Sequence, residues 1–389
     1  MRIIIANKFY YNRGGDCIAS IALEKLLKEK GHEVVFFSMK HPDNFVSEWE
    51  SFFPTHVDFQ KGGLKKKLQA ANRIFYSQEV KKQFSKLLDI FKPDVIHLNN
   101  IHSQLSPYIG ELAHKRGIKV LWTLHDYKLI CPKYTCIYNN KICECCIHNN
   151  VISVLTKRCM KNSLAASLLA YLEAIFWNRK RLNNNTDYFI APSHFIKFKM
   201  IQGGFPENKI KVIPNFINRE LTDIKSEKKD YYCYVGRLSE EKGVETLLKV
   251  AKQLPYKLII IGTGPLKNNL KYNYDLIEFI GFKEWDELKN IIEQARFLVL
   301  PSEWNENNPI SVIESHCLGT PVLGANIGGI PEMISSANGM LFKSGDSSDL
   351  KEKIQQMFKK EFDYNLISKT AREKFSAENY YNEIIRIYE

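Results

Sequence analysis

The sequence has 389 residues, which is long for one α/β domain and sufficient for two hydrophobic cores. Hydrophobic residues make up 44% and charged residues 25%, as in a folded globular protein. The apolar run at the start, within Met1–Ala6, is too short for the core of a signal peptide. No stretch reaches the roughly 18 uninterrupted apolar residues of a membrane-spanning helix. We therefore expect a cytoplasmic protein.

The formal net charge is +12, and lysines cluster at Lys65–Lys67, Lys81–Lys82 and Lys225–Lys229. One interpretation is a set of solvated helix faces and loops. The other is attraction to an anionic membrane surface or to a phosphate-bearing substrate. Nucleic acid is disfavoured as a partner, because no recognition motif accompanies the basic residues.

The first half of the chain alternates short apolar runs with amphipathic segments. Apolar periodicity predicts helices that end at Gly31 and before Pro93, and another over 162–182. Residues 38–78 show poor periodicity and receive no assignment. The predicted strands are Ile3–Ala6, Val34–Phe37, Val95–Leu98, Val120–Leu124, Tyr188–Ala191 and Lys211–Ile213.

The second half repeats this rhythm. Its predicted strands are Tyr231–Val235, Leu258–Ile261, Ile277–Ile280, Phe297–Leu300 and Pro321–Leu323. Short β-branched runs separated by helices indicate parallel strands that are buried on both faces. Two such series predict an α/β protein with two doubly wound domains.

The charged segment Leu221–Asp230 is the predicted linker between these domains. We expect an N-terminal domain over 1–220 and a C-terminal domain over 221–370. A last helix within 371–389 places Tyr381, Ile384, Ile385 and Tyr388 on one face, so we expect it to pack on the N-terminal domain.

Two features of the first half lie where predicted strands end, which is where open parallel sheets bind ligands. Gly14-Gly15 follows the first strand and precedes a helix, so backbone N–H groups there can approach an anion. A tight turn explains the same pair. His125-Asp126 ends another strand. The histidine there either belongs to a ligand site or only satisfies hydrogen bonds at the strand end.

The first strand of the second half leads into Gly236-Arg237-Leu238, with Lys242-Gly243 shortly after. An arginine grips two phosphate oxygens at once, and a lysine five residues later adds a point charge. This turn can therefore hold a diphosphate leaving group and stabilise its developing charge. The alternative is a surface turn with a salt bridge.

The strongest signal is the segment 301–314. A strand ends at Leu300, a polar loop follows, and a helix begins near Pro309, where proline is well tolerated. Glu306 lies in the loop and Glu314 in the helix, with seven residues between them. This spacing predicts one carboxylate over a bound sugar and the other about a turn and a half further, toward a ribose.

These features together resemble glycosyltransferase family 4, over essentially the whole chain. The resemblance implies the GT-B fold, in which two Rossmann-like domains with parallel sheets face a central cleft. It implies transfer of a sugar from a nucleotide diphosphate sugar with retained anomeric configuration, with no catalytic metal and no protein nucleophile. The matching segments are Gly14-Gly15, His125-Asp126, Asp187–Ser193, Pro214-Asn215, Gly236–Leu238, Lys242-Gly243, Gly262–Pro265, Glu306 with Glu314, and Gly319–Val322.

By this resemblance, Arg237 and Lys242 bind the donor diphosphate, Glu306 the transferred sugar and Glu314 the ribose. His125 contacts the sugar from the opposite domain, so that His125, Glu306, Arg237 and Lys242 form the catalytic set. The implied donor-binding residues are Gly14, Gly15, Arg237, Lys242, Gly264, Glu306, Asn307, Asn308, Pro309, Ile310 and Glu314.

The chain departs from the family pattern in two places. Many members carry Glu-Gly-Phe-Gly where this chain has Glu306–Pro309. The identity of the donor sugar therefore cannot be inferred from those members. The stretch Cys131–Cys159 resembles an insertion of capsule and surface-polysaccharide members. It implies a growing, lipid-linked glycan as acceptor. The expected location is the cytoplasm, with a peripheral position on the inner membrane face as the alternative.

Six of the nine cysteines lie between Cys131 and Cys159. Cys143 and Cys146 form a half-site for metal, and Cys131 with Cys159 could complete a tetrahedral thiolate cage for a structural zinc ion. The alternative is a set of free buried thiols. No cofactor is expected for catalysis itself.

Two other functions compete with the transferase. A sugar-nucleotide epimerase of the same fold would need an acid–base set beyond His125, and the sequence offers none. A basic, non-catalytic protein that binds nucleic acid or membrane would leave the strand-end motifs unexplained. The apolar helix within Ser163–Trp177, followed by Arg179–Arg181, fits either a core helix or a helix that docks on a membrane.

Overall fold

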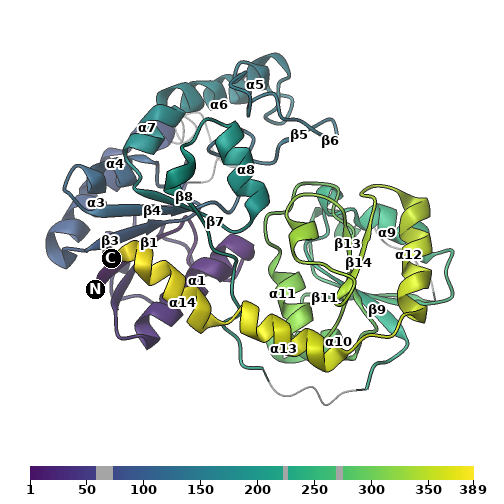
Figure 1. Ribbon diagram of the computed structural model, residues 1–389. Coiled ribbons are helices and arrows are strands. Elements are labelled where there is room, and N and C mark those ends of the chain that lie inside the picture. Colours follow the sequence, from purple (N-terminus) through teal and green to yellow (C-terminus); the bar gives the residue numbers. More distant parts are fainter. Residues whose placement is uncertain (58–72, 222–226, 269–274) are drawn as a thin grey trace. The chain divides into compact units, whose positions relative to one another are not determined.

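The computed structural model describes residues 1–57, 73–221, 227–268 and 275–389. The chain forms two compact units (Figure 1). Unit 1 comprises Met1–Pro214 with Tyr381–Glu389, and unit 2 comprises Asn215–Tyr380. The predicted lysine cluster Lys65–Lys67 and half of the linker, residues 222–226, lie outside the described residues.

Unit 1 contains a six-stranded parallel sheet in the order β2-β1-β3-β4-β7-β8. The strands are β1 (Arg2–Ala6), β2 (Glu33–Phe37), β3 (Val95–Leu98), β4 (Lys119–Thr123), β7 (Tyr188–Ala191) and β8 (Ile210–Val212). The main helices around this sheet are α1 (Gly15–Glu29), α3 (Gln78–Phe91), α4 (Tyr108–His114) and α8 (His194–Gln202). All six predicted strands of this half are confirmed within a residue.

The segment after β4 is irregular. It contains the short hairpin β5 (Ile137–Tyr138) and β6 (Lys141–Ile142), followed by the one-turn helix α5 (Ser153–Thr156). The prediction of one continuous helix over 162–182 is wrong. The structure has α6 (Leu164–Phe176) and α7 (Arg179–Asn184), because Asn178 interrupts the helix and its side chain caps α7 by accepting from Arg181 N.

Unit 2 contains a second six-stranded parallel sheet, in the order β11-β10-β9-β12-β13-β14. Its strands are β9 (Tyr231–Val235), β10 (Lys257–Ile261), β11 (Ile277–Gly281), β12 (Leu298–Leu300), β13 (Val322–Ala325) and β14 (Gly339–Phe342). Its helices include α9 (Val244–Ala251), α10 (Trp285–Gln294), α11 (Ile310–Cys317), α12 (Ser347–Lys359) and α13 (Tyr364–Lys374). In chain order this is 3-2-1-4-5-6, the Rossmann arrangement.

The two parallel sheets confirm the predicted α/β class. The central strands are buried on both faces, with Ile3, Ile4 and Ile5 of β1 fully inaccessible to solvent. Strand β14 was not predicted, since Gly339–Phe342 is short and begins with glycine, a poor strand former.

The last helix, α14 (Ala377–Tyr388), starts where the chain leaves unit 2. Ile384 and Tyr388 are buried, and the Tyr388 hydroxyl lies 2.6 Å from Nδ1 of His97 on β3. Lys119 of β4 donates to the backbone carbonyls of Ile387 and Tyr388. These contacts attach the end of the chain to the sheet of unit 1.

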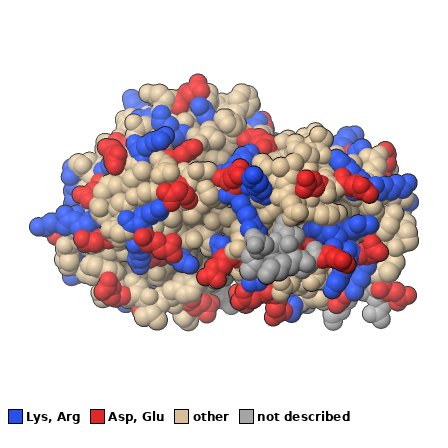
Figure 2. All heavy atoms as spheres, turned by 60° about the horizontal axis from the view of Figure 1, so that its bottom comes forward, with Lys and Arg blue, Asp and Glu red and all other residues tan. Residues whose placement is uncertain are grey.

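Basic residues are spread over the surface and alternate with acidic ones on the face drawn in Figure 2. Many of the lysines have partners: Lys115, for example, pairs with Glu111, and Lys257 pairs with Glu278. Across the described ranges, no helix combines the length and the apolar character that a membrane crossing requires.

Candidate active site

In unit 2, the strand order reverses direction between β9 and β12, which are paired neighbours. Open α/β sheets bind ligands at such a point, outside the carboxyl ends of the strands. The loop after β9 carries Arg237 and Lys242, and the loop after β12 carries Glu306. The fold thus brings the two strongest sequence signals to the same edge of one sheet.

Gly243 fixes how closely these two loops approach. Its φ is +66°, and a Cβ atom there would lie 1.9 Å from the carbonyl oxygen of Pro301. A backbone hydrogen bond of 2.9 Å from Glu303 N to Glu241 O joins the same two loops. Only glycine permits this contact, which places the turn 237–243 directly against the end of β12.

The contact brings Lys242 and Glu306 together. Lys242 Nζ lies 2.5 Å from Glu306 Oε1, and the hydroxyl of Ser302 donates to the same oxygen at 2.7 Å. Glu306 is buried and Ser302 is fully inaccessible. Lys242 also lies over the ring of Trp304, 5.3 Å from its centre. The carboxylate is therefore held in one orientation by a charge and a hydroxyl.

The backbone of Glu306 is held as firmly as its side chain. Gly329 N donates to Glu306 O at 2.7 Å, and a Cβ on Gly328 would lie 2.3 Å from that oxygen. Gly328 has a φ of +62°, which side chains rarely tolerate. The Gly328-Gly329 pair of the sequence thus has a structural role, because it packs against the backbone of Glu306 and fixes its position.

Arg237 differs from Lys242 because it faces solvent. Its side chain is 63% exposed and pairs with Glu241 of the same turn. Such an exposed pair costs little to break, so the guanidinium can turn toward an anionic ligand. Gly264, the other predicted residue nearby, lies in a loop that is hydrogen-bonded to Leu238. Leu238 N donates to Thr263 O, and Leu266 N donates to Leu238 O.

The segment after Glu306 leads into α11, which begins at Ile310 with Pro309 as the preceding cap residue. The Asn308 side chain points back into unit 2. Its Oδ1 accepts from Asn215 N at 2.9 Å, while Asn215 Nδ2 donates to Asn308 O at 2.8 Å. These two hydrogen bonds give Asn308 a structural role, because they join the Pro214-Asn215 motif to the loop of Glu306. Asn307 lies between Glu306 and Asn308 in the chain.

Glu314 lies on α11 and is almost completely buried. Burial raises the pKa of its carboxyl group to about 7, although Arg219, 3.7 Å away, acts in the opposite direction. Glu314 is thus a carboxyl group that changes charge near neutral pH. Such a group can either donate or accept hydrogen bonds toward a hydroxylated ligand.

In unit 1, polar residues gather at the carboxyl edge of the sheet. Asp16, in the first turn of α1, accepts from Asn100 Nδ2 at 2.9 Å, and Asn100 follows β3. His125, just after β4, donates from Nε2 to Asn99 Oδ1 at 2.8 Å. Loops after three different strands thus meet at one edge.

Gly14 and Gly15 stand at the start of α1, with Gly14 as the cap residue and Gly15 as the first helical residue. Gly14 is extended, with a φ of −165°, and a Cβ on Gly15 would meet no atom within 4 Å. A left-handed turn is therefore not why glycine stands here. The pair leaves open space at the N-terminus of a fifteen-residue helix, where backbone N–H groups favour anions.

Burial lowers the pKa of His125 to about 4, with nearby Asp16 opposing the shift and Lys8 supporting it. His125 is therefore neutral at pH 7, donating at Nε2 and leaving Nδ1 as an acceptor. The pKa of the neighbouring Asp126 is raised by burial, and its Oδ1 accepts from Lys128 N at 2.8 Å.

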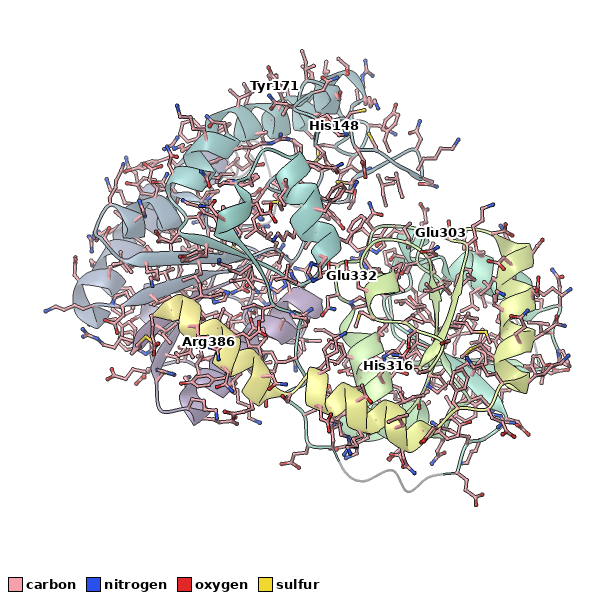
Figure 3. All side chains as sticks on the ribbon, in the orientation of Figure 1. His148, Tyr171, Glu303, His316, Glu332 and Arg386 are labelled. Carbon is pink, nitrogen blue, oxygen red and sulfur yellow. The ribbon has the colours of Figure 1, made fainter. Side chains whose placement is uncertain are left out.

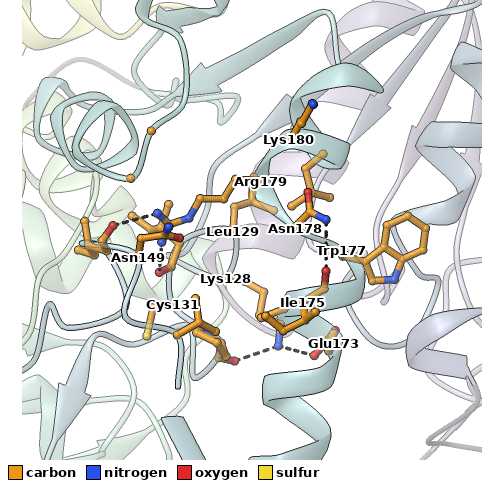
Figure 4. Close-up of a pocket in the computed structure, with 18 of the residues that line it drawn as sticks. Lys128, Leu129, Cys131, Asn149, Glu173, Ile175, Trp177, Asn178, Arg179 and Lys180 are labelled. Carbon is orange, nitrogen blue, oxygen red and sulfur yellow. Dashed lines mark hydrogen bonds and ion pairs between the residues drawn. The ribbon is translucent and has the colours of Figure 1, made fainter. Parts of the chain in front are cut away.

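Unit 1 also contains a pocket of about 630 Å³ between the cysteine-rich segment, α7 and the end of α8 (Figure 4). Lys128 crosses it, donating to Glu173 Oε2 at 2.7 Å and to Pro132 O at 2.9 Å. Apolar side chains such as Ile130 and Trp177 complete the lining. The pocket thus combines apolar walls with a few fixed polar groups, as ligand sites do.

Arg179 holds the walls of this pocket together. Its guanidinium donates to the carbonyl oxygens of Ile130, Cys146 and Ile147. Gln202, also in the lining, has a buried Oε1 for which the described residues offer no hydrogen-bond partner. A buried acceptor without a donor favours a ligand hydroxyl or a water molecule.

The cysteine-rich segment brings the predicted zinc ligands to one place. Cys131, Cys143, Cys146 and Cys159 line one very small pocket, and all are free thiols. Lys157 Nζ lies 3.1 Å from the sulfur of Cys145 and 3.5 Å from that of Cys143. No three His, Cys, Asp or Glu side chains in the described part of the chain are already arranged to hold a metal ion. The zinc site therefore stays a prediction.

Sequence reasoning missed several residues of these sites. Asp16, Lys128 and Glu173 belong to them, as do Asn100 and Ser302. Asp16 directly follows Gly14-Gly15, and Asn99-Asn100 directly follows β3, so strand-end position would have identified both. Glu173 gave no such signal, since it is one acid within an apolar helix.

Two Rossmann-like units, each with polar groups at the switch-point edge of its sheet, define the GT-B class of glycosyltransferases. The family profile described as "Glycosyltransferase Family 4" matches residues 21–221, and that described as "Glycosyl transferases group 1" matches residues 219–374. The chain belongs to glycosyltransferase family 4, and it is a glycosyltransferase.

Individual relatives are distant. A 42.6 kDa protein from the cps region of Klebsiella pneumoniae is 26% identical over 86% of this chain and 87% of its own length. The amylovoran biosynthesis glycosyltransferase AmsK of Erwinia amylovora is 27% identical over 51% of this chain and 54% of its own. Among solved structures, Anabaena HepE in complex with UDP and glucose matches with a TM-score of 0.67 at 16% identity, covering 100% of this chain and 99% of that one.

Proposed function

We propose that the protein transfers a sugar from a nucleotide diphosphate sugar to a glycan acceptor, with retention of anomeric configuration, in polysaccharide biosynthesis. The observation that carries the proposal is the joint position of Lys242, Glu306 and Ser302 at the switch point of unit 2. A cation beside a firmly oriented carboxylate suits a ligand that carries phosphate next to sugar hydroxyls.

The donor is assigned to unit 2. Arg237 and Lys242 hold the diphosphate. Glu306 accepts hydrogen bonds from hydroxyls of the transferred sugar, and Glu314 accepts hydrogen bonds from the ribose hydroxyls. The N-terminus of α11, with Asn307, Pro309 and Ile310, adds backbone groups. HepE, which shares the fold, binds UDP and glucose, and this supports a nucleotide-linked donor. The relatives in a cps region and in amylovoran biosynthesis support polysaccharide as the product.

The acceptor is assigned to unit 1, in the pocket beside the cysteine-rich segment. The buried Gln202 Oε1 can accept a sugar hydroxyl, and Lys128, Arg179 and Lys180 make the lining cationic, with Glu173 as the opposing acid. A glycan linked to a lipid through phosphate fits this combination of charge and apolar wall. His125 is assigned to the transferred sugar, and Gly14-Gly15, at the start of α1, to the donor phosphates. We place the protein at the inner face of the membrane.

The reaction needs no group beyond these. The bond between the anomeric carbon and the phosphate oxygen breaks while an acceptor hydroxyl attacks from the same face. The leaving phosphate takes the proton of that hydroxyl. Arg237 and Lys242 stabilise the charge that develops on the departing diphosphate, which is an electrostatic contribution to the rate.

The test starts with a thermal-shift screen of nucleotide sugars, because a ligand that binds only the folded state raises the melting temperature. Transfer by the wild type is then compared with Arg237→Ala and Glu306→Gln. We expect each change to slow turnover by about ten- to a hundredfold, since each removes a charged hydrogen bond. Arg386→Ala, on α14, and Glu278→Gln, on β11, are the matched controls.

Two outcomes would overturn the proposal. Unchanged turnover in both active-site variants would remove the donor assignment. A changed sugar nucleotide formed without any acceptor would instead favour the epimerase.

A further inference from the structure

Helix α6 buries small and polar residues and exposes apolar ones, which is the reverse of a normal helix of a soluble protein. Its buried residues are Ser167, Ala170 and Glu173, which are small or polar. Four of its five large aliphatic residues face solvent: Leu164 is 54% exposed, Leu168 43%, Leu172 44% and Ile175 50%, whereas Leu169 is half-buried. These four follow one another at intervals of four, four and three residues, so they form a single stripe along the helix. We call them the α6 stripe.

Specific contacts prevent α6 from turning this stripe inward. The Ser167 hydroxyl accepts from Met160 N at 3.1 Å. Glu173 accepts from Lys128 at 2.7 Å and from the Ser103 hydroxyl at 3.0 Å. Ser163 caps the first turn. Rotation of the helix would leave Lys128, which is only 12% exposed, without its carboxylate, which is costly, so the exposed stripe is a stable feature of the fold.

The chain on either side of the stripe is basic. Between Cys145 and Thr186, Glu173 is the only acidic residue, and Lys128 already pairs with it. The basic residues of this stretch are Lys157, Arg158, Lys161, Arg179, Lys180 and Arg181. Arg158 and Lys161 precede the stripe and Lys180 follows it, and all three are exposed. Figure 1 shows α6 along an outer edge of unit 1, and Figure 3 shows Tyr171 of this helix on that edge.

We infer that the α6 stripe, with Arg158, Lys161 and Lys180, is a docking surface for an anionic lipid bilayer. An exposed row of aliphatic side chains bordered by cations is the pattern of a helix that lies in the membrane interface. A second copy of the chain fits less well, because a twofold contact through this surface would place the same cations opposite one another.

The position of α6 connects this surface to the acceptor pocket. Glu173, Ala174 and Ile175, in the last turn of the helix, line the pocket in unit 1 (Figure 4). A docked α6 therefore places the pocket beside the lipid head groups. This inference rests on the proposed function only in the choice of acceptor, because the binding of vesicles can be measured without any sugar transfer.

The test uses the full chain and sedimentation with vesicles of phosphatidylcholine, with or without phosphatidylglycerol. We expect binding only when the anionic lipid is present. The double variant Leu168→Gln with Leu172→Gln should weaken binding about tenfold or more, because two aliphatic side chains no longer enter the interface. Leu366→Gln, on α13, is the control, since Leu366 is 53% exposed and should not affect binding.

A second set of variants tests the charge. Arg158→Gln, Lys161→Gln and Lys180→Gln combined should weaken binding roughly a hundredfold, at about 1 kcal/mol for each basic residue near an anionic surface. Lys252→Gln, Lys359→Gln and Lys369→Gln combined remove the same charge from unit 2 and serve as the control. The melting temperature of every variant should match that of the wild type, because all the changed side chains are exposed.

Three results would overturn the inference. These are equal vesicle binding by all variants, no binding by the wild type, and a lipid-independent dimer that the two leucine changes abolish. Transfer to a short, soluble acceptor should be the same in the leucine variant and the wild type. If the wild type itself does not transfer sugar to the soluble acceptor, that result counts against the proposed function and not against the docking surface.

Discussion

The ammonium of Lys242 lies 2.5 Å from Oε1 of Glu306, although 64 residues separate them in the chain. Their loops follow β9 and β12, which are paired strands at the switch point of the sheet. The lysine offsets the charge of the buried carboxylate, which is what holds both groups at one edge of the sheet. The proposed donor, with phosphate on one side and hydroxyls on the other, would present a partner to each of them.

This pairing predicts coupled effects on stability. Lys242→Met or Glu306→Gln alone should lower the free energy of unfolding of unit 2 by about 1–3 kcal/mol, since each leaves a poorly solvated charge without its partner. The double variant should lose less than the sum, with a coupling of about 0.5–3 kcal/mol. Chemical denaturation measures all three variants. Lys249→Met, on α9, is the control, and strictly additive losses would contradict the pairing.

Gly243 is predicted to be intolerant of any side chain. Gly243→Ala adds a Cβ that lies 1.9 Å from Pro301 O and requires a left-handed conformation. Gly281→Ala has the same conformational cost at a φ of +74° but meets no atom within 4 Å. We expect Gly281→Ala to lower the free energy of unfolding by about 1–2 kcal/mol, and Gly243→Ala to lower it clearly more. Equal losses would show that the contact between the two loops is not needed.

Glu314 should make the stability of unit 2 depend on pH. Burial raises the pKa of its carboxyl group in the folded state to about 7, so folding favours the protonated form. The stability that this group contributes is complete below its ordinary pKa of 4.5 and is lost as the pH rises through about 7. Denaturation from pH 4 to pH 8 should show this decline in the wild type. Glu314→Gln should flatten it, whereas Glu278→Gln should not.

The attachment of α14 should depend on a buried tyrosine. Tyr388→Phe removes the hydroxyl that lies 2.6 Å from His97 Nδ1 and leaves that buried nitrogen without its partner, at a cost of about 1–3 kcal/mol. Tyr381→Phe removes a similar bond, of 2.9 Å to His32 Nε2, at a less buried position, and should cost less. Hydrogen exchange of α14 amides and denaturation of unit 1 measure both. The same loss in both variants would contradict a special role for the buried pair.

The cysteine cluster gives a prediction on metal content. Protein purified without chelators should contain about one zinc ion per chain if Cys131, Cys143, Cys146 and Cys159 bind it as thiolates. Cys143→Ser with Cys146→Ser should abolish the zinc and lower the melting temperature. Cys145→Ser changes a neighbouring thiol outside the predicted set and should keep the zinc. Metal-free wild-type protein of unchanged stability would identify the cluster as free thiols.

Hydrophobic patterning in the sequence was enough to locate most strands and the polar residues that follow them. The eleven strands that it predicts are all present, because buried parallel strands need continuous apolar runs and tolerate few other patterns. The same reasoning predicted that Arg237, Lys242 and Glu306 lie at one edge of a sheet, and the structure has them there, because the carboxyl ends of parallel strands meet at one edge. The family and its fold followed from the order of these motifs.

The pairing of these residues depends on contacts between distant parts of the chain, which the folded structure shows. The structure assigned Asn308 to Asn215, opposed Gly243 to Pro301, and split the helix over 162–182 at Asn178. It also turned the aliphatic residues of α6 outward, because Glu173 pairs with Lys128 on the inner side. Hydrophobic periodicity shows that a helix has an apolar face, but neighbouring elements determine whether that face is covered.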